Sequence, residues 1–122
     1  MKTSWYYLRS LAWELRRTGD LVIDGPERSA FHRAAMSRCY HAAFHAIRSA
    51  APAHLMQGRS SDHGRLLCWL EVEVGAGSDA LHTLRSLRNV ADYDLNEDFD
   101  PADLDRSLAY ADSLIARFGI EP

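Results

Sequence analysis

The sequence predicts an all-α protein, built as an antiparallel up-and-down bundle of about five helices. Apolar residues recur at helical spacing in successive segments, and glycine and proline separate these segments from one another. No stretch alternates polar and apolar residues for long enough to predict a strand. A length of 122 residues and a hydrophobic content of 47% fit one modest core, so we expect residues 1–122 to form a single domain.

The first predicted helix covers residues 4–18 and is stopped by Gly19. Its arginines lie opposite the apolar face and are expected to point into solvent. The apolar run at residues 21–23 is too short for a sheet, and we expect it to be an apolar plug in the connector that ends at residues 24–27. The predicted core face of this helix consists of Trp5, Leu8, Leu11, Ala12 and Leu15.

The second predicted helix is the longest and extends to about Ala50, before Pro52. Asp24, followed by Pro26 and Glu27, is the signal for its start. Its predicted packing face consists of Met36, Tyr40, Ala43, Phe44 and Ile47. A stripe that is basic, or can become basic, follows the opposite edge and consists of Arg38, His41, His45 and Arg48.

Three further elements complete the predicted bundle. After a loop at residues 53–61, Ser61 or Asp62 is expected to cap a third helix, and a break at residues 75–78 precedes a fourth helix at about residues 79–92. Asp100 and Pro101 then form the clearest helix start in the chain, as the cap and the first helical residue. The last helix stops at Gly119, and its predicted buried residues are Leu104, Leu108, Ala111, Ile115 and Phe118.

Composition limits the classes of function. The formal net charge is −3, so contact with nucleic acid would have to come from a local basic patch. Cys39 and Cys68 lie among apolar neighbours in predicted helices and are expected to be buried free thiols in a reducing cytosol. The N-terminal residues lack the apolar run of a signal peptide, and no later run approaches a membrane span. We therefore expect a cytoplasmic protein without membrane contact.

Several catalytic motifs are missing from the sequence. It has no glycine-rich phosphate loop, no serine elbow and no dinucleotide fingerprint, and we expect no cofactor. His41 and His45 stand one helical turn apart, a spacing that can bind a metal ion, but no glutamate follows His41 and no third ligand is close in sequence. We therefore expect no metal site, and histidines that lie at a surface or an interface.

Arg88 lies on the apolar side of the fourth predicted helix, where a leucine would be expected. Its guanidinium group cannot lose its proton and is costly to bury unpaired, and Asp92, one turn on, is the nearest candidate partner. The pair has two interpretations, a structural lock at the helix end or part of a functional site. The stripe that Arg88 interrupts consists of Leu81, Leu84, Ala91 and Leu95.

The candidate site is a polar set on two helices. If the helices are neighbours, these side chains meet across a groove. Cleaving RNA without a metal needs a group that accepts the 2′-hydroxyl proton, a cation that stabilises the phosphorane, and a proton donor for the leaving oxygen. Histidine and arginine can fill these roles, whereas the alternative is a buried polar network that fixes helix register or a dimer interface. The set consists of Arg38, His41 and His45 on the second helix and Arg88, Asn89, Asp92 and Tyr93 on the fourth.

Three runs, in order and spacing, resemble the HEPN domain family in its small single-domain bacterial and archaeal branch: SRCYHAAFHA at residues 37–46, DHG at 62–64 and LRNVADYD at 87–94. The resemblance extends from about residue 30 to the end of the sequence. It implies a four- or five-helix bundle that forms a two-fold dimer, in toxin-antitoxin modules beside a nucleotidyltransferase or in phage defence and other RNA-targeting systems. Active members are metal-independent endoribonucleases, in which an arginine is followed after four to six residues by a histidine, at the dimer cleft.

The chain departs from this signature. Arg88 and Asn89 fit its start, but residues 93–95 are tyrosine, aspartate and leucine where the histidine would fall, and no histidine follows His82. Tyr93 is a poor replacement at neutral pH because the unperturbed pKa of tyrosine is about 10. The family's general acid/base is thus absent from its usual place.

Three hypotheses follow. The first is a HEPN-like dimeric module without the usual ribonuclease activity, which binds RNA, a nucleotide or a partner nucleotidyltransferase through Arg38, Arg88, Asn89, Asp92 and Tyr93. The second is a metal-independent endoribonuclease toxin, in which Arg88 steadies the phosphate and His41 or His45 is the acid/base. The third is a protein-interaction scaffold, in which the Arg88–Asp92 pair is only a lock. The missing histidine weighs against the nuclease, and the basic stripe weighs against the scaffold.

Overall fold

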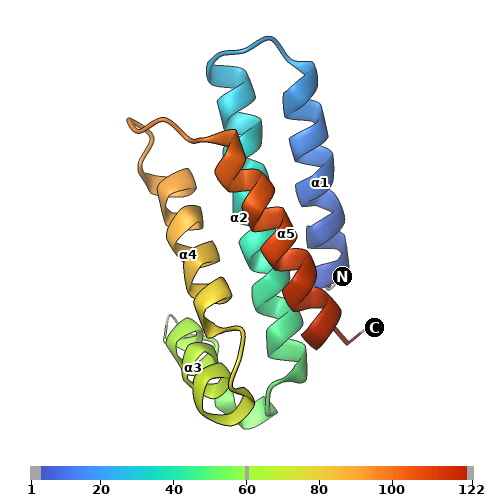
Figure 1. Ribbon diagram of the computed structural model, residues 1–122, viewed down its shortest axis with the longest axis vertical. Coiled ribbons are helices and arrows are strands. Elements are labelled where there is room, and N and C mark those ends of the chain that lie inside the picture. Colours follow the sequence, from blue (N-terminus) through green and yellow to red (C-terminus); the bar gives the residue numbers. More distant parts are fainter. Residues whose placement is uncertain (1–3, 60, 121–122) are drawn as a thin grey trace.

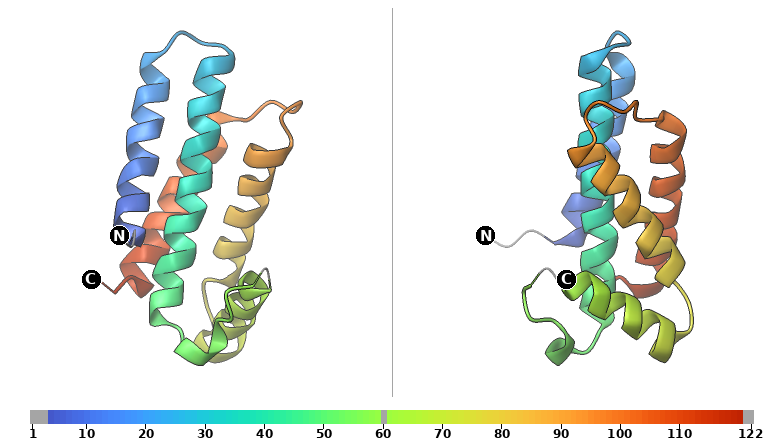
Figure 2. Two further views of the ribbon diagram at one scale, coloured as in Figure 1. Left: turned by 180° about the vertical axis from the view of Figure 1, so that it is seen from behind. Right: turned by 90° about the vertical axis from the view of Figure 1, so that its left-hand side faces the viewer.

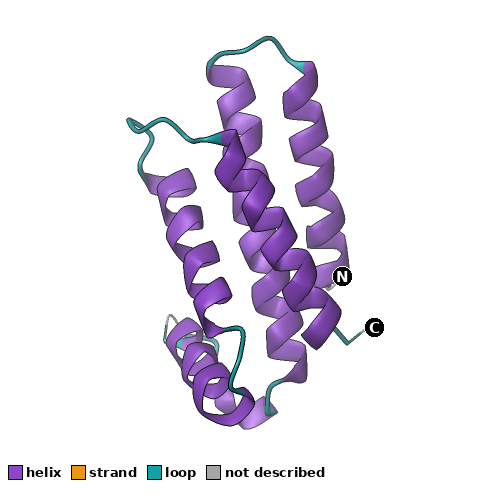
Figure 3. Ribbon diagram, in the orientation of Figure 1, coloured by secondary structure: helices purple, strands orange, loops and turns teal. Residues whose placement is uncertain are grey.

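The computed structural model describes residues 4–59 and 61–120, and these residues form an up-and-down bundle of α-helices (Figure 1). No strand occurs in this part of the chain (Figure 3), so the all-α prediction is confirmed. In chain order the elements are α1 (Trp5–Leu21), α2 (Pro26–Ala50), η1 (Ala53–Leu55), α3 (Asp62–Trp69), η2 (Leu70–Val74), α4 (Ser78–Tyr93) and α5 (Pro101–Phe118). Of these, η1 is a short 3-10 turn before α3, and η2 is a π-helical turn that follows α3.

The long helix α2 is the centre of the bundle. It forms an antiparallel hairpin with α1, and α4 and α5 both pack against it (Figures 1 and 2). Helix α3 crosses the end of the bundle at which α2 ends and α4 begins (Figure 2). The start of α1 meets the end of α5, where Trp5 Nε1 donates a hydrogen bond to the Ile120 carbonyl at 3.2 Å. This arrangement brings the last turns of α2, the start of α3 and the middle of α4 together.

The predicted packing faces of α2 and α5 form the core. On α2, Met36, Tyr40, Ala43 and Ile47 are buried, while Phe44 is half-buried at its edge. The five residues predicted to be buried on the last helix are all buried. Helices α3 and α4 contribute the remaining large fully buried side chains of the core, which are Leu66, Leu81 and Leu84 with Leu70 of the π-helical turn.

Helix starts differ in how they are capped. As predicted, Asp100 caps α5: its Oδ1 accepts a hydrogen bond from the Ala102 amide at 2.9 Å, and Pro101 is the first helical residue. Asp24 does not cap α2, because Gly25 takes the cap position with a φ of 145°, a conformation that favours glycine. The side chains of Ser61 and Asp62 do not cap α3 either. Ser60, within the same predicted loop, lies outside the described residues.

The predicted end of the first helix is wrong. Helix α1 continues through Gly19 to Leu21, and Gly19 is buried against α2. A Cβ atom at Gly19 would lie 2.9 Å from both Phe31 Cβ and His32 Cδ2, so the glycine permits the close contact of the two helices. Leu21 and Ile23 are 83% and 92% exposed and form no apolar plug, because the turn points them away from the bundle.

Other side chains also depart from their predicted burial. Leu11 is exposed on α1, Leu95 follows the end of α4 and is exposed, and Cys68 is an exposed free thiol. Cys39 is a buried free thiol as predicted, and burial raises its pKa to about 12. None of the helices in the described part of the chain is both long and apolar enough to cross a membrane.

The arginines of α1 do more than face solvent. Arg9 lies 2.8 Å from Asp112, and Arg16 lies 2.6 Å from Asp105, so both tie α1 to α5. These pairs are partly exposed, and each contributes about 1 kcal/mol or less to stability. They add to the orientation of the two helices, while the apolar core supplies most of the stability.

Candidate functional site

A basic pocket lies where α2, the start of α3 and α4 meet, and we call it the α2–α4 pocket. Its volume is about 380 Å³, near the lower end of the range of small-ligand sites, about 300–1,000 Å³. Four arginines and three histidines line it, with a single carboxylate. The complete lining is Tyr40, His41, Phe44, His45, Arg48, Gly58, Arg59, Asp62, His63, Arg85 and Arg88.

Helical periodicity places most of these side chains. His41 and His45 are one turn apart on α2, and their rings stack with centroids 6.4 Å apart. Arg85 and Arg88 are three residues apart on α4 and reach the pocket from the opposite side. The loop before α3 closes the remaining side with Arg59.

Asp62 organises that loop. Its Oδ1 accepts a hydrogen bond from the Gln57 amide at 3.0 Å, and its Oδ2 accepts one from the Gly58 amide at 2.8 Å. The Gln57 hydrogen bond is the main cause of a lowered pKa for this carboxyl group, which therefore stays ionised. Asp62 therefore shapes the loop that closes the pocket, and the charge of Arg48 also lowers its pKa.

Arg88 forms the ion pair expected from the sequence. Its Nε lies 2.9 Å from Asp92 Oδ2, although the N–H is not aligned for a hydrogen bond. Asp92 also accepts a hydrogen bond from Ser37 Oγ at 3.3 Å, which links the pair to α2. The guanidinium carbon lies 5.8 Å from the ring centroid of Tyr40 and 5.6 Å from that of Tyr93. Arg88 thus joins α4 to α2 while it lines the pocket.

The three other arginines of the pocket form no salt bridge in the described part of the chain, although the charge of Arg48 acts on Asp62, the one carboxylate of the lining. Arg48, Arg59 and Arg85 form no salt bridge with any carboxylate within residues 4–59 and 61–120. Their charge converges on one concavity of a chain whose formal net charge is −3. A local concentration of positive charge of this kind attracts anions.

His41 and His45 are held in their neutral form. Burial is the main cause that lowers the pKa of each below its usual value. Arg88, His45 and Arg38 lower the pKa of His41 further, against a smaller opposite effect of Asp92, and Arg48 lowers that of His45. At neutral pH both imidazoles can therefore accept a proton.

His63 forms the floor of the pocket with Tyr40. The His63 side chain is 4% exposed, and its Nδ1 lies 2.7 Å from the Tyr40 hydroxyl. Its Nε2 is also buried, yet it has no hydrogen-bond partner among the described residues. A buried polar atom without a partner costs about 1–3 kcal/mol, so its retention at a pocket wall calls for an explanation.

The structure brings together part of the predicted site. Arg88, His41 and His45 line one pocket, as the relocated-histidine hypothesis requires. Arg38 affects the pKa of His41 but is not part of the lining. Asn89, Asp92 and Tyr93 surround Arg88 outside the pocket, where Asn89 Oδ1 accepts a hydrogen bond from Arg88 Nη1 at 3.4 Å.

The site predicted from the sequence omitted several residues of the pocket. Arg48 was assigned only to the basic stripe of the second helix, and Arg59, His63 and Arg85 were given no role. Arg85 carried a usable signal, because residues three apart on a helix share a face with Arg88. His63 was named within the DHG run at residues 62–64 that carries the family resemblance, with no role of its own, and the structure buries it. Arg59 reaches the pocket through the loop fold that Asp62 imposes, and its own sequence neighbourhood carries no signal for this.

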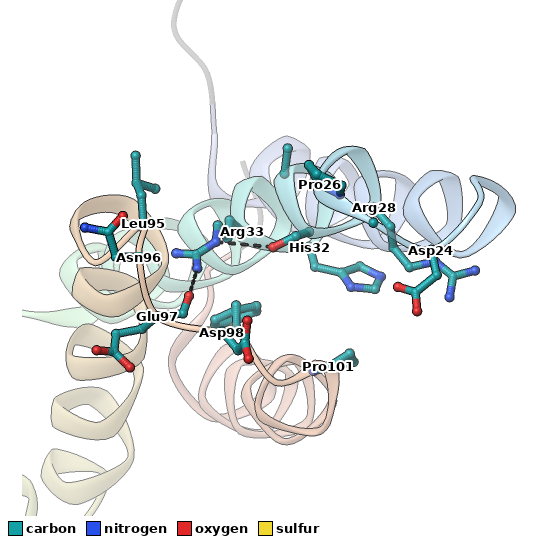
Figure 4. Close-up of a pocket in the computed structure, with 14 residues that line it drawn as sticks. Asp24, Pro26, Arg28, His32, Arg33, Leu95, Asn96, Glu97, Asp98 and Pro101 are labelled. Carbon is teal, nitrogen blue, oxygen red and sulfur yellow. Dashed lines mark hydrogen bonds between the residues drawn. The ribbon is translucent and has the colours of Figure 1, made fainter.

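A second cavity, of about 650 Å³, lies at the other end of α2 (Figure 4). Its arginines are already used by the fold. Arg33 donates hydrogen bonds to the carbonyls of Val90 and Ala91, each at 3.1 Å, and to that of Glu97, as Figure 4 shows for Glu97. Arg28 donates to the carbonyl of Gly19 at 3.2 Å. This cavity therefore marks a structural junction, where arginines cap the ends of α1 and α4.

Across residues 4–59 and 61–120, no group of three His, Cys, Asp or Glu side chains is arranged to hold a metal ion. No protein-family model matches this chain, and neither curated proteins nor solved structures contain a significant match to it.

Proposed function

We propose that this protein binds single-stranded RNA through the α2–α4 pocket. The observation that carries the proposal is the convergence of Arg48, Arg59 and Arg85, none with a carboxylate partner among the described residues, beside Arg88 in one concavity. Arginine side chains bind phosphate oxygens well, and they make many of the contacts of proteins to the phosphates of nucleic acid. The resemblance to the HEPN domain family favours RNA among the molecules that carry phosphate.

In this proposal the chain is a HEPN-like module of a toxin-antitoxin or phage-defence system in the cytoplasm. It acts as a homodimer and docks a partner nucleotidyltransferase, as the resemblance implies. Sedimentation of the purified protein tests the dimer directly. A monomer at all accessible concentrations would remove the dimer from the proposal and leave the pocket unaffected.

The test of RNA binding is fluorescence anisotropy with a labelled single-stranded RNA, measured over a range of salt concentrations. Arg85→Ala should weaken binding and reduce the slope of log affinity against log salt by about 1, because one phosphate contact is lost. Arg106→Ala is the matched control, since Arg106 is exposed on α5 and, among the described residues, forms its salt bridge with Asp103. Equal binding by the Arg85→Ala variant and the wild type would overturn the proposal and favour a scaffold that binds protein.

Ribonuclease activity is a second candidate, favoured by one specific observation. His41 and His45, both neutral at neutral pH, line the same pocket as Arg88. A neutral histidine can take the 2′-hydroxyl proton, and an arginine can stabilise the phosphorane charge. The two candidates differ in outcome, because a binding module leaves the RNA intact.

The cleavage assay uses purified protein and RNA with a chelator present. If the pocket is catalytic, His45→Ala and Arg88→Ala should each abolish cleavage, and His54→Ala, which alters an exposed histidine outside the pocket, should not. RNA that stays intact in the presence of wild-type protein, but is bound by it, would assign the chain to binding alone. Cleavage that survives in both pocket variants would indicate a contaminating nuclease.

A further inference from the structure

The hydrogen bond between Tyr40 and His63 allows two positions for the imidazole proton, and one of them places an N–H group on Nε2. Burial raises the pKa of the Tyr40 phenol, so the hydroxyl keeps its hydrogen at neutral pH and can donate it to His63 Nδ1, 2.7 Å away. Burial, with Arg85 and His82 as smaller causes, lowers the pKa of His63 to about 4, so the imidazole is neutral. A neutral imidazole that accepts at Nδ1 carries its hydrogen on Nε2.

When Tyr40 donates to Nδ1, the Nε2–H group of His63 is a donor without an acceptor. His63 is only 4% exposed, and its Nε2 has no hydrogen-bond partner among the described residues. The residue also lines the pocket. The arginines of the pocket are mounted on long flexible side chains. His63 has a short side chain, and the bond between its Nδ1 and Tyr40 holds the imidazole in a fixed position.

The shape of the charged region indicates which phosphate it fits. Grooves that bind single strands along their length carry basic side chains in a track that follows the backbone. Here Arg48, Arg59 and Arg85 converge on one pocket of about 380 Å³. Several unpaired cations in one concavity match a phosphomonoester, which carries a charge of about −1.5 to −2 near neutral pH, better than the single charge of a phosphodiester.

We infer that the α2–α4 pocket recognises a terminal phosphate, carried by a nucleotide or by an RNA end, and that His63 Nε2–H donates a hydrogen bond to one of its oxygens. The inference rests on the proposed function and narrows it from RNA in general to the phosphomonoester group. Arg85 and Arg59 neutralise the charge of that group, and Tyr40 acts as a positioning residue because it holds the tautomer of His63.

The first measurement is nuclear magnetic resonance of the His63 imidazole at neutral pH, with inorganic phosphate and then uridine monophosphate as probes. In the free protein we expect a neutral ring with its hydrogen on Nε2. Each probe should shift the Nε2–H resonance and slow its exchange with solvent. A ring protonated on Nδ1, or a ring unaffected by saturating uridine monophosphate, would overturn the inference without any variant.

The second measurement compares one RNA oligonucleotide with a 5′-phosphate, with a 3′-phosphate and with hydroxyl groups at both ends. A preference of at least about tenfold for one phosphorylated end, equivalent to about 1.4 kcal/mol, supports the inference. Tyr40→Phe should reduce this preference while it keeps the aromatic ring, and His63→Gln, which keeps an N–H donor, should retain more of it than His63→Ala. His54→Gln is the control, since His54 is exposed and outside the pocket lining.

The outcomes separate this inference from the proposed function. RNA that binds equally with or without a terminal phosphate, through Arg85, would overturn the phosphomonoester and keep the RNA-binding proposal. If uridine monophosphate binds and shifts the His63 Nε2–H resonance while no RNA binds, the phosphomonoester inference stands and the RNA-binding proposal is overturned. The pocket would then be assigned to a free nucleotide. If inorganic phosphate binds without affecting His63, the arginines alone form the site and the role of His63 is wrong.

Discussion

Arg88 Nε lies 2.9 Å from Asp92 Oδ2, one turn further along α4, and the two side chains are 22% and 25% exposed. The sequence left open whether this pair is a lock or part of a site. In the structure the two alternatives are compatible. Asp92 accepts a hydrogen bond from Ser37 and so links the pair to α2, while Arg88 also lines the α2–α4 pocket. Asp92 therefore both stabilises the fold and offsets one positive charge of the pocket.

Asp92→Asn should separate these two effects. Loss of the carboxylate charge leaves Arg88 without its ion-pair partner, and we expect the free energy of unfolding to fall by about 1–2 kcal/mol. RNA affinity should rise, because the pocket gains a net positive charge. Urea denaturation and fluorescence anisotropy measure the two quantities on the same sample.

Asp105→Asn is the control for Asp92→Asn. It changes the net charge by the same amount, but Asp105 pairs with Arg16 at the junction of α1 and α5, outside the lining of the pocket. It should lower stability by about 1 kcal/mol or less and leave RNA affinity unchanged. Equal gains in affinity for both variants would show that net charge, and not the pocket, controls binding.

Arg33→Met should release the loop between α4 and α5. The Arg33 guanidinium group donates to carbonyls at the end of α4 and of the following loop, and it lies 5.8 Å from the ring centroid of Phe99. Methionine keeps the apolar stem but leaves these carbonyls unbonded, which should cost about 1–2 kcal/mol. Hydrogen exchange should become faster in residues 94–99 than elsewhere.

Arg17→Met is the comparison for Arg33→Met. Arg17 is exposed and pairs only with Glu14 on its own helix, so its loss should change stability by no more than about 0.5 kcal/mol. If the two variants unfold at the same urea concentration, the contacts of Arg33 contribute nothing beyond those of a surface arginine.

The sequence predicted the features that depend on neighbouring residues. Asp100 and Pro101 are adjacent, and their effect on the start of α5 is local, as is the helical spacing that gives α2 and α5 their buried faces. The Arg88–Asp92 pair was predictable for the same reason, since its members are one helical turn apart. These contacts need no knowledge of how the helices pack.

The features that were missed depend on the tertiary arrangement. A glycine at position 19 is the ordinary signal of a helix end. Its role in the structure is to allow the close approach of α2, and this is visible only from its contacts with Phe31 and His32. Arg33 bonds to carbonyls about 60 positions away, as its contact with Ala91 shows. The same holds for His63, whose spacing fits a core residue and whose partner Tyr40 lies on another helix.

Gly19→Ala tests the contact between α1 and α2. Alanine favours a helix by up to about 1 kcal/mol over glycine, but its Cβ would lie 2.9 Å from Phe31 Cβ, which the backbone holds in place. Overpacking typically costs about 1–3 kcal/mol, so we expect a net loss of stability. Gly64→Ala is the control, because among the described residues no atom beyond its chain neighbours and its own helix backbone lies within 4 Å of its added Cβ, and it should stabilise the protein slightly. A rise in melting temperature for both variants would show that α1 can shift to accommodate the methyl group.

Acid should destabilise the protein partly through His63. Burial lowers the folded-state pKa of His63 to about 4, below the ordinary value of 6.5 that applies in the unfolded chain, so between these values the unfolded state binds more protons. The stability due to neutral His63 is therefore complete above pH 6.5 and is lost as the pH falls towards 4, by at most about 3 kcal/mol. His41 and His45, whose pKa values are also lowered, act in the same direction.

Urea denaturation at several pH values from 7 to 4 measures the slope of the free energy of unfolding against pH, and His63→Gln should make this slope less steep. An unchanged slope in that variant would mean that His63 titrates normally, and that its environment is more open to water than its burial indicates.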